Sequence, residues 1–310
     1  MIKLAIIIPA YKMAFLNESL QSIFNQTDKR FNVYVGNDNS YEDIDIIVEN
    51  YLSYPNFHYK KFDNNLGSSS LVKQWERCIN MIGDEEWIWL FSDDDMMEEN
   101  AVECFYKRNL SVHNVYRFNL NIVDKDNNLL DEVIYPDSET SVSFLENRLQ
   151  YKYINAITNY VFSREIYLKK NGFVDFPLAW SSDDASIIQF AEGGRILLIN
   201  DSRISWRNSG TNISTNSDPD LVKKKIAARV QFVKWLFGKK LYLLNDIENH
   251  ESKVAQWFYI GLKSDFLKDE VWEKFKSCTK LFPYLGFHIY KLFFANLKSI
   301  WWNKILGIYV

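Results

Sequence analysis

The alternation of strand-like and helix-like segments over the first hundred residues constrains the fold more than any other feature of the sequence. Apolar, β-branched runs predict strands over residues 3–11, 31–38, 57–63 and 86–92. Apolar residues at helical spacing predict helices over residues 17–24, 41–52 and 71–82. This order predicts an α/β fold with a doubly wound, mostly parallel sheet, in which ligands bind at the carboxyl ends of the strands.

A polar loop divides the rest of the chain. Residues 208–220 are rich in Asn, Ser, Thr, Gly, Asp and Pro, which is typical of loops and linkers. Helices and strands continue up to this loop, including a strand over residues 195–201, whereas residues 221–310 are mostly helical and rich in aromatic side chains. We therefore expect an α/β domain over residues 1–215 and a helical carboxyl-terminal region over residues 216–310.

The charge and the cysteine content exclude several classes of protein. Lysine and arginine number 36 against 40 acidic residues, which gives a net charge of -4 and no overall attraction to nucleic acid. The three cysteines are far apart and form no CxxC pair, so neither a disulfide framework nor a structural zinc site is expected. The short apolar run before Pro9 does not resemble a signal peptide, and no uncharged stretch is long enough for a spanning helix. These features favour a cytoplasmic protein.

Three consecutive carboxylates, Asp93, Asp94 and Asp95, directly follow the strand predicted over residues 86–92. Like charges this close repel one another unless a cation neutralises them. Carboxylate oxygens suit Mg²⁺ or Mn²⁺, which usually completes its coordination shell with substrate phosphates and water. A solvated acidic loop that caps the following helix is the alternative interpretation.

Two further acidic sites accompany this cluster. Asp38 ends the second predicted strand, where its carboxylate could accept a hydrogen bond from the imide N–H of a uracil ring or simply form a turn. Asp183 and Asp184 precede the apolar face of a predicted helix, whose amino terminus one of them could cap. Capping requires only one acid, so the second is available for chemistry.

Taken in order, these motifs resemble the inverting glycosyltransferases of family 2, which have a GT-A fold with a Rossmann-like nucleotide-binding half. The resemblance covers about residues 3–215 and rests on several motifs in the same order, which is more specific than any one of them. The matching segments are IIIPAYK, SIFNQT, VGNDNS, NNLGSSSLVKQWERCI, LFSDDD, SSDDAS and SWRNSGTNIS.

The resemblance implies how the donor would be bound. Pro9 and Tyr11 would line the nucleotide pocket, and Asp38 would bind the uracil. The run of acids corresponds to the family's D-x-D motif. There Asp95 would bind the metal ion, Mn²⁺ or Mg²⁺, and Asp93 or Asp94 would hold the ribose.

The later motifs would supply the rest of the site. Arg207 would lie beside the diphosphate, in a loop that folds over the donor. Of the acid pair Asp183 and Asp184, the second member would be the catalytic base. The sequence departs from the family pattern at Ser92, where the D-x-D block often begins, and at Ser209, where many relatives carry a histidine.

The implied activity is an inverting, metal-dependent hexosyltransferase. It would transfer a sugar from a nucleotide-sugar donor, a UDP-sugar by preference, to an acceptor hydroxyl in bacterial surface glycan assembly. The metal ion on Asp95, with Arg207, would stabilise the charge of the leaving diphosphate, and Asp184 would deprotonate the acceptor. The acceptor would be a glycan or a lipid-linked saccharide.

Aromatic residues mark two further candidate surfaces. Trp180 stands shortly before the acid pair and could stack on a sugar, with core packing as the alternative. Residues 281–310 combine aromatic side chains with Lys291, Lys298 and Lys304 along one predicted helical face. That pattern fits peripheral contact with the inner face of the cell membrane, a helix packed on the catalytic domain, or a homodimer interface.

Two other functions compete with sugar transfer. One is a catalytically silent protein that binds a nucleotide sugar or a glycan on the same fold, although binding alone requires no base. The other is a sugar nucleotidyltransferase, which usually has a glycine-rich and basic phosphate loop after its first strand. The segment PAYKMAFLNES has no such loop.

Overall fold

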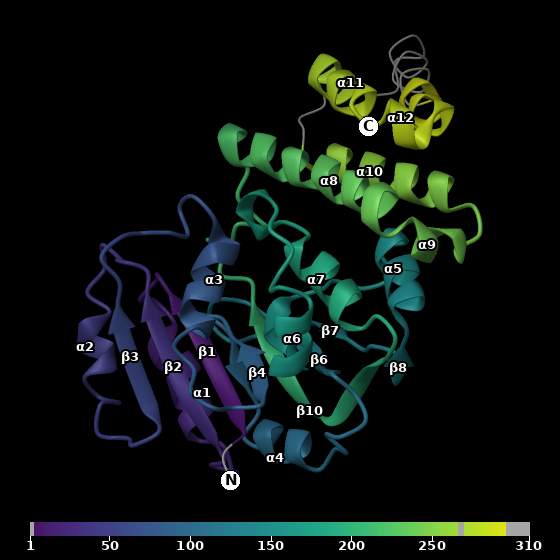
Figure 1. Cartoon of the computed structure of the whole chain (residues 1–310). Helices are drawn as coiled ribbons and strands as arrows, with labels where there is room; N and C mark the ends of the chain where they lie inside the picture. The colour runs from purple at the N-terminus through teal and green to yellow at the C-terminus, as the bar shows by residue number, and fades with distance from the viewer. Residues whose placement is uncertain (1–2, 266–269, 296–310) are drawn as a thin grey trace.

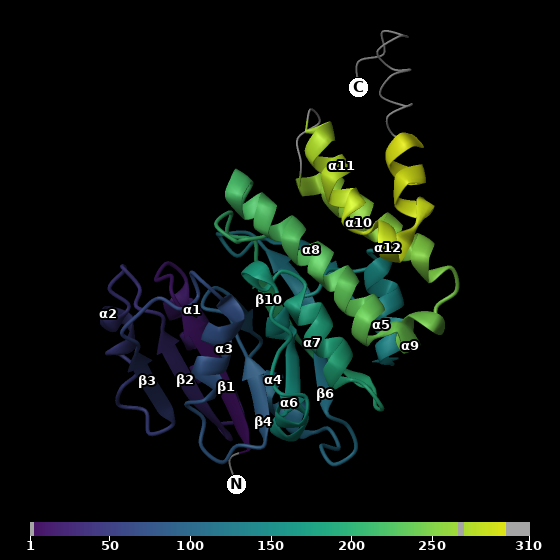
Figure 2. The same ribbon diagram turned by 45° about the horizontal axis from the view of Figure 1, so that its top comes forward.

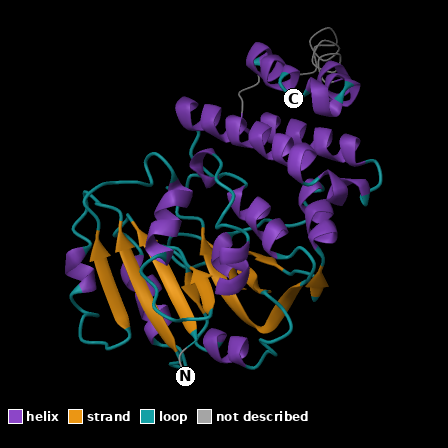
Figure 3. Cartoon of the chain, in the orientation of Figure 1, coloured by secondary structure: helices purple, strands orange, loops and turns teal. Residues whose placement is uncertain are grey.

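The computed structural model describes residues 3–265 and 270–295 of the chain (Figure 1). Within these ranges a sheet of ten strands forms the centre of the molecule, and helices cover both of its faces (Figure 3). The strands are β1 (Leu4–Ala10), β2 (Phe31–Asn37), β3 (Phe57–Lys61), β4 (Trp87–Leu90), β5 (Met96–Met97), β6 (Val115–Val123), β7 (Leu129–Val133), β8 (Ser138–Glu139), β9 (Tyr160–Ser163) and β10 (Ile196–Arg207).

The helices follow the predicted order. They are α1 (Leu16–Phe24), α2 (Asp45–Val48), α3 (Leu71–Ile79), α4 (Ala101–Tyr106), α5 (Ser141–Leu149), α6 (Arg164–Lys169), α7 (Ser182–Phe190), α8 (Pro219–Lys239), α9 (Leu241–Asn245), α10 (His250–Asp265), α11 (Val271–Thr279) and α12 (Phe282–Leu285). Two short 3₁₀ helices, η1 (Ile157–Asn159) and η2 (Pro177–Ala179), interrupt the loops before β9 and α7.

Most pairings along the main path of the sheet are parallel, as predicted, and some strands are antiparallel. This path runs β3-β2-β1-β4-β9-β6-β10-β5. The four strands from β3 to β4 are parallel, as predicted, but β9 pairs antiparallel with both β4 and β6. The α/β class is confirmed, and the parallel half is the part that alternating strands and helices could predict.

Two predicted elements have different lengths in the structure. Strand β10 continues through residues 200–207, where only residues 195–201 were expected, and its register against β6 shifts between Ile199 and Arg203. The helix expected over residues 41–52 is a single short helix, Asp45–Val48. The extension of β10 matters for function, because it carries the chain directly to the acids that follow β4.

The strands of the parallel half bury alternating side chains in two apolar clusters. From β1, Leu4, Ile6 and Ile8 pack with α1, α2 and α4 on one face, here termed the α1-side cluster. Ala5 and Ile7 point to the opposite face, where the α3-side cluster includes α3, α5, α6 and α7. Because both faces are buried, these strands are continuous apolar runs.

The helices after residue 215 are not packed as a separate unit. Val222 and Phe232 of α8 and Trp257 of α10 belong to the same α3-side cluster as Ala5 and Ile7. In the view of Figure 2, α8 and α10 lie beyond the sheet, with α11 and α12 on their outer side. The α3-side cluster therefore contains residues from both sides of residue 215. The division into a domain over residues 1–215 and a helical region over residues 216–310 stays a proposal.

Candidate active site

The carboxyl ends of β1, β2 and β4 meet at one edge of the sheet, on the side toward which their arrows point in Figure 3. There Asp93, which follows β4, accepts hydrogen bonds at Oδ2 from the backbone N–H groups of Tyr11 and Lys12, both at 2.9 Å. The acid therefore fixes the loop that leaves β1. Tyr11 in turn contacts the exposed Tyr41 ring edge to face, with the ring centroids 5.9 Å apart. Pro9 lies half-buried in the same strand end.

Asp38 is buried and already satisfied by protein donors. Its two oxygens accept from the backbone N–H groups of Leu66 and Gly67 at 2.7 and 2.8 Å, and Oδ1 also pairs with the Arg77 guanidinium at 2.5 Å. A side chain at Gly67 would lie 2.6 Å from the Asp38 carboxylate, so this close approach requires glycine. The structure thus shows Asp38 organising the glycine loop, and contact with a nucleobase stays a prediction.

Asp94 and Asp95 have few protein donors. Asp95 is fully buried and accepts at Oδ1 from the Arg207 backbone N–H at 2.9 Å, but its Oδ2 has no hydrogen-bond partner among the residues that the structure describes. Within the described part of the chain, the one side chain that donates to Asp94 is Asn212, at a long 3.4 Å. Burial raises the pKa of both carboxyls, to about 6 for Asp95 and about 8 for Asp94, where the adjacent charges of Asp95 and Asp93 add to the effect.

These two carboxylates fit a divalent cation. A buried, unpartnered carboxylate oxygen and a neighbouring carboxylate with a single weak donor leave negative charge uncompensated, which Mg²⁺ or Mn²⁺ would relieve. Among the described residues, no group of three or more His, Cys, Asp or Glu side chains could hold a metal ion by itself. Such an ion would need phosphate and water for the rest of its shell, as is usual for magnesium.

The loop after β10 folds over this acidic cluster, as expected. Asn212 joins it to Asp94, and Lys12 donates from Nζ to the Thr211 carbonyl oxygen at 2.7 Å. Ser209, in the place of the family's histidine, donates to Asn212 Oδ1 through its backbone N–H and holds that amide in position. Lys12 also lowers the pKa of Asp94 through its charge, although burial has the larger, opposite effect.

Arg207 ends β10 and is held by protein acceptors. Its side chain is fully buried, and its guanidinium donates to the Asp94 and Lys125 carbonyl oxygens and to Glu18 Oε2, at 2.9, 3.2 and 2.8 Å. The same group lies over the Phe15 ring, 4.2 Å from its centroid. A guanidinium with these partners fastens the end of β10 to α1. Contact between Arg207 and a donor diphosphate stays a prediction.

The acid pair at the start of α7 is built into a network of protein donors. Asp184 pairs with Arg148 of α5, whose Nε lies 2.7 Å from Oδ1 and whose second terminal nitrogen lies 3.2 Å from Oδ2. Asn155 also donates to Asp184 Oδ1 at 3.0 Å. This carboxylate is almost fully buried, so its oxygens are largely occupied.

Asp183 has the environment expected of the base. It is half-buried, and its donors among the described residues are Asn155 at 3.3 Å and the Asp184 backbone N–H at 2.8 Å. Burial and then the adjacent Asp184 charge raise its pKa to about 7, against a lowering by Arg148. Asp183 thus has fewer protein donors than Asp184, and which of the two acids is the base stays a prediction.

One segment connects the two acidic sites. Asn155 contacts Asp183 and Asp184, and the side chain of Thr158, three residues later, lies beside Asp95. Three residues span at most about 11 Å of backbone. A short segment of backbone therefore connects the acid pair to the strand-end acids.

The backbone before α7 is strained, and Trp180 lies within the strained turn. Leu178, Ala179 and Ser181 all have left-handed backbone angles, with φ of 61°, 53° and 63°. Such angles cost about 1–3 kcal/mol each for residues other than glycine and are concentrated at functional sites. The Trp180 ring is half-buried, and Lys225 lies over it at 4.9 Å, so the predicted sugar stacking has a cation as competitor.

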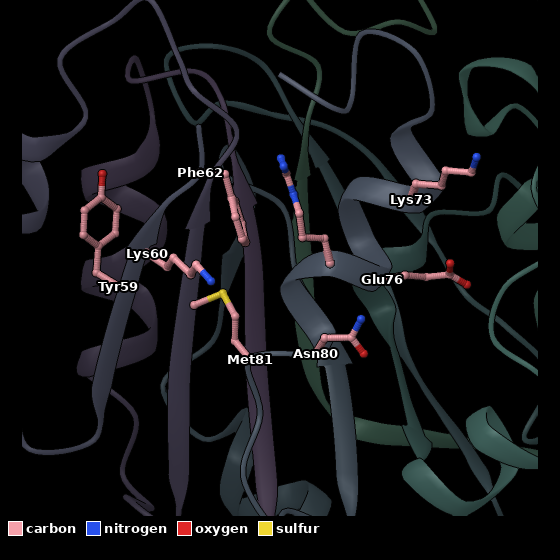
Figure 4. Close-up of a pocket in the computed structure, with 8 residues that line it drawn as sticks. Tyr59, Lys60, Phe62, Lys73, Glu76, Asn80 and Met81 are labelled. Atoms are coloured by element: carbon pink, nitrogen blue, oxygen red, sulfur yellow. The ribbon is translucent and has the colours of Figure 1, made fainter. Parts of the chain in front are cut away.

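A groove of about 880 Å³ is lined by residues of β3 and α3 (Figure 4). Tyr59 and Lys60 reach it from β3, and Lys73 and Glu76 from α3. Its link to the site is Arg77, which pairs with Asp38 and lies over the Phe62 ring of the groove at 3.9 Å. The predicted donor-binding and catalytic residues do not line it.

Several residues of the site could not be identified from the sequence. Arg148 and Asn155 lie 36 and 29 positions before Asp184, with no local motif to mark them. Lys12 stands next to Tyr11 and was recognisable only as a basic residue after the first strand. Arg77 had a signal, because it follows the glycine loop on the helix that faces Asp38.

Comparisons with known proteins agree with this fold. Residues 5–126 match the model of the family described as Glycosyl transferase family 2. A crystal structure of S. aureus TarS 1-349 in complex with UDP has a TM-score of 0.56 and 14% identity, covering 99% of this chain and 92% of that chain. The same protein in complex with UDP-GlcNAc has a TM-score of 0.56 and 13% identity, covering 99% and 93%.

A more distant structure has the same fold. GalNAc-T7 with UDP, GalNAc and Mn²⁺ has a TM-score of 0.54 and 10% identity, covering 92% of this chain and 58% of that chain. No curated protein matches the chain in sequence. At these identities the structures show the fold, and the family model covers the segment with the strand-end acids. Residues 5–126 are therefore similar to glycosyl transferase family 2, and the chain has a GT-A fold.

Proposed function

We propose that this protein is an inverting glycosyltransferase that transfers a sugar from a UDP-sugar to an acceptor hydroxyl. The observation that carries the proposal is the presence of two acidic sites joined by the segment Asn155–Thr158. One site keeps an unpartnered carboxylate oxygen among the described residues, and the other has protein donors. Direct displacement requires a stabilised leaving group on one side of the sugar and a base on the other. The UDP and UDP-GlcNAc complexes of S. aureus TarS support the choice of donor.

On the donor side, the chain's own residues hold the nucleotide and its diphosphate. Tyr11 and Pro9 would line the nucleoside pocket, Asp38 would accept from the base, and Asp93 would keep the β1 loop in place. A divalent cation, Mn²⁺ or Mg²⁺, held by Asp95 and Asp94 would compensate the charge of the departing diphosphate. The Mn²⁺ in the GalNAc-T7 structure supports this assignment.

Lys12 takes the role first given to Arg207. Its ammonium group lies between the β1 loop and Thr211 of the covering loop, and its charge acts on Asp94. A donor diphosphate bound at Asp94 would therefore meet Lys12, while Arg207 holds β10 in place from behind.

On the acceptor side, Asp183 would remove the proton from the attacking hydroxyl. A carboxylate with a pKa near 7 is partly ionised at neutral pH and is basic enough to accept the proton as the new bond forms. Arg148 keeps Asp184 paired, so the two carboxylates do not compete for the same partner. Attack from this face and departure on the other would invert the anomeric carbon.

The test is a donor screen with UDP-, GDP- and dTDP-sugars that measures nucleotide release with and without Mn²⁺. We expect release with a UDP-sugar and acceptor, with loss of the signal in EDTA and in Asp183→Asn. Donor binding without any release would favour a silent binding protein. Pyrophosphate formation from a nucleoside triphosphate and a sugar phosphate would indicate a nucleotidyltransferase instead.

For the acceptor we propose a lipid-linked saccharide of bacterial surface glycan assembly, reached at the inner face of the cell membrane. No helix within the described ranges is long and apolar enough to cross a bilayer. In residues 281–295, Leu285 and Ile289 are fully buried, which supports packing on the domain, whereas Phe287 and Phe294 are 79% and 53% exposed. The predicted positions Lys298 and Lys304 lie outside the described residues.

A truncation after residue 295 tests membrane contact without disturbing packing on the domain, because it keeps the buried residues Leu285 and Ile289. We expect full-length protein to sediment with anionic vesicles and the truncated protein, or Phe287→Ser, to sediment less. A protein that never sediments would remove the membrane from the proposal, and sedimentation analysis would then test a homodimer.

A further inference from the structure

Asn155 is the one residue whose side chain contacts both members of the acid pair within the described parts of the chain. Its amide Nδ2 donates to Asp184 Oδ1 at 3.0 Å and to Asp183 Oδ2 at 3.3 Å. Tyr160 donates from its hydroxyl to Asn155 Oδ1 at 2.7 Å. Because that hydroxyl donates, the amide oxygen must point toward Tyr160, and the NH₂ group must point toward the acids.

A buried ion pair supports this arrangement from behind. Arg117 of β6 and Glu139 of β8 are 0% and 1% exposed at their side chains and lie 2.6 Å apart. Arg117 also donates to the Tyr160 oxygen at 3.4 Å, so the hydroxyl hydrogen is directed away from the guanidinium and toward Asn155. Tyr153 donates to Glu139 and completes the pairing of that carboxylate. The network is thus continuous from the centre of the sheet to the acid pair.

The network treats the two acids differently. Arg148 reaches Asp184 through two nitrogens, but Asp183 has no such partner. Of the side chains described here, only Asn155 donates to Asp183. A hydrogen bond to a carboxylate stabilises its ionised form, so Asn155 opposes the effects of burial and of the neighbouring charge on Asp183.

We propose that Asn155, with its amide oriented by Tyr160, is the positioning residue that fixes the orientation and the proton affinity of Asp183. The inference rests on the proposed function, in which Asp183 accepts the proton from the acceptor. Asn155 touches neither donor nor metal in this scheme, and it acts only through the acid pair. The family motif SSDDAS contains no sign of it, because Asn155 comes from the loop before η1.

The charged and titratable groups that face Asp183 come from three elements. Asp184 of α7 raises its pKa, and Arg148 of α5 lowers it, while burial has the largest effect and also raises it. Tyr160 of β9 faces it through the Asn155 amide. Removing the Asn155 donor leaves these groups in place and withdraws one source of stabilisation for the carboxylate, so the pKa of Asp183 must rise.

The test compares Asn155→Ala and Tyr160→Phe with the control Asn159→Ala. Asn159 is a fully buried amide in the same segment, but it donates to the Phe118 carbonyl oxygen of β6 and contacts neither acid. We expect the acidic limb of kcat/KM to move up by about one pH unit in Asn155→Ala, because a hydrogen bond to a charged group is worth about one pKa unit or more. Tyr160→Phe should move it less, and Asn159→Ala should leave it in place.

A second readout does not depend on catalysis. The carboxyl carbons of ¹³C-labelled aspartate are titrated by NMR, and the Asp183 signal is identified by its absence in Asp183→Asn. The inference is supported if the Asp183 titration midpoint rises in Asn155→Ala, and a midpoint equal to that of the wild type overturns it. An equal rise in Asn159→Ala overturns it as well, since any buried amide would then have the same effect.

The two readouts separate the inference from the function on which it rests. If the NMR midpoint shifts but no variant or wild type transfers sugar, Asn155 positions the acid and the proposed function fails. If transfer is observed and depends on Asp183 while the midpoint stays constant, the function stands and Asn155 is only structural. Tyr160→Phe, the more conservative change, supplies the same comparison should Asn155→Ala not fold.

Discussion

The two acidic sites of this protein contain buried carboxylates of the same kind, yet their surroundings differ. The pair Asp183 and Asp184 is provided with an arginine and an oriented amide, both from the chain itself. At the strand ends, Asp95 keeps an unpartnered buried oxygen, and Asp94 has one long contact. A folded chain rarely leaves such atoms unpaired without a functional reason.

The difference indicates which ligand each site would bind in the proposed function. In the proposed function, the acid pair, which has protein donors, acts on an acceptor hydroxyl. The strand-end acids are incomplete, and a cation with a diphosphate would complete them. The comparison therefore predicts which changes affect donor binding, which affect proton transfer, and which affect folding alone.

The largest effect is expected from Asp183→Asn, which removes the base but preserves its shape. Positioned general-base catalysis is worth about 10²–10⁴-fold, or roughly 3–5 kcal/mol of barrier. Transfer should fall by that much, while donor affinity measured by calorimetry changes by less than about threefold. Near wild-type transfer in this variant would contradict the assignment of Asp183 as the base.

Asp184→Asn is the matched control for that experiment. It leaves Arg148 without its carboxylate, and breaking a buried ion pair typically costs about 3–5 kcal/mol of folding free energy. We expect a lower melting temperature as its main effect. A loss of transfer at unchanged stability, and larger than in Asp183→Asn, would return the role of base to Asp184.

A smaller but still marked effect is expected at the strand ends. Asp94→Asn removes one of the two carboxylates with few donors, and contacts to charged groups are worth about 1.5–3 kcal/mol, or about 10- to 100-fold in affinity. Calorimetry with a UDP-sugar and Mn²⁺ should show this loss, and EDTA should reduce wild-type affinity in the same way. If neither the Asp94→Asn substitution nor EDTA changes the affinity for the UDP-sugar, the strand-end acids need no cation.

The pH dependence of transfer should report the acid pair alone. A base must be ionised to accept a proton, and the pKa of Asp183 is raised to about 7. Below that pH, kcat/KM should fall about tenfold per pH unit. The pH profile of Asp183→Asn should show no such fall near pH 7. A rate that is constant down to pH 5 would show that the acid is ionised much more readily than its burial implies.

The smallest effect is expected from Asp38→Ala. Asp38 is a buried acid outside the two acidic sites, and it has protein donors of its own. Uridine affinity should fall by about 1 kcal/mol, or fivefold, since a typical hydrogen bond is worth that much. Stability should fall too, because Arg77 and the Leu66–Gly67 turn lose their shared acceptor. A loss of stability with unchanged uridine affinity would make Asp38 a purely structural acid.

Local patterns predicted the parts of the fold that are local in origin. The strands β1 to β4 and the helices between them followed from apolar runs and helical spacing, and the acids after β4 followed from their position at a strand end. The antiparallel insertion of β9 could not be predicted, because its partners β4 and β6 are distant in the sequence. The same is true of the extension of β10, whose polar residues are stabilised by pairing with β6.

The candidate site shows the same limit. The motifs located Asp93 to Asp95 and the acid pair, but a motif does not specify which member is paired by a distant arginine. Arg148 pairs with Asp184, and Glu18 together with two carbonyl oxygens accepts from the Arg207 guanidinium. These are tertiary contacts, which local sequence patterns do not contain.

The two apolar clusters on opposite faces of the sheet have a consequence for how the chain is made. The buried members of the α1-side cluster all lie between Leu4 and Ile204, whereas the α3-side cluster extends from Ala5 to Phe293. During synthesis, one face of the sheet can therefore close well before the ribosome has finished the chain, while the other remains open until the last helices emerge. Nascent chains expose apolar surface for as long as such a face is open, and that surface is what chaperones recognise. We expect the newborn protein to depend on chaperones during the interval between these two events.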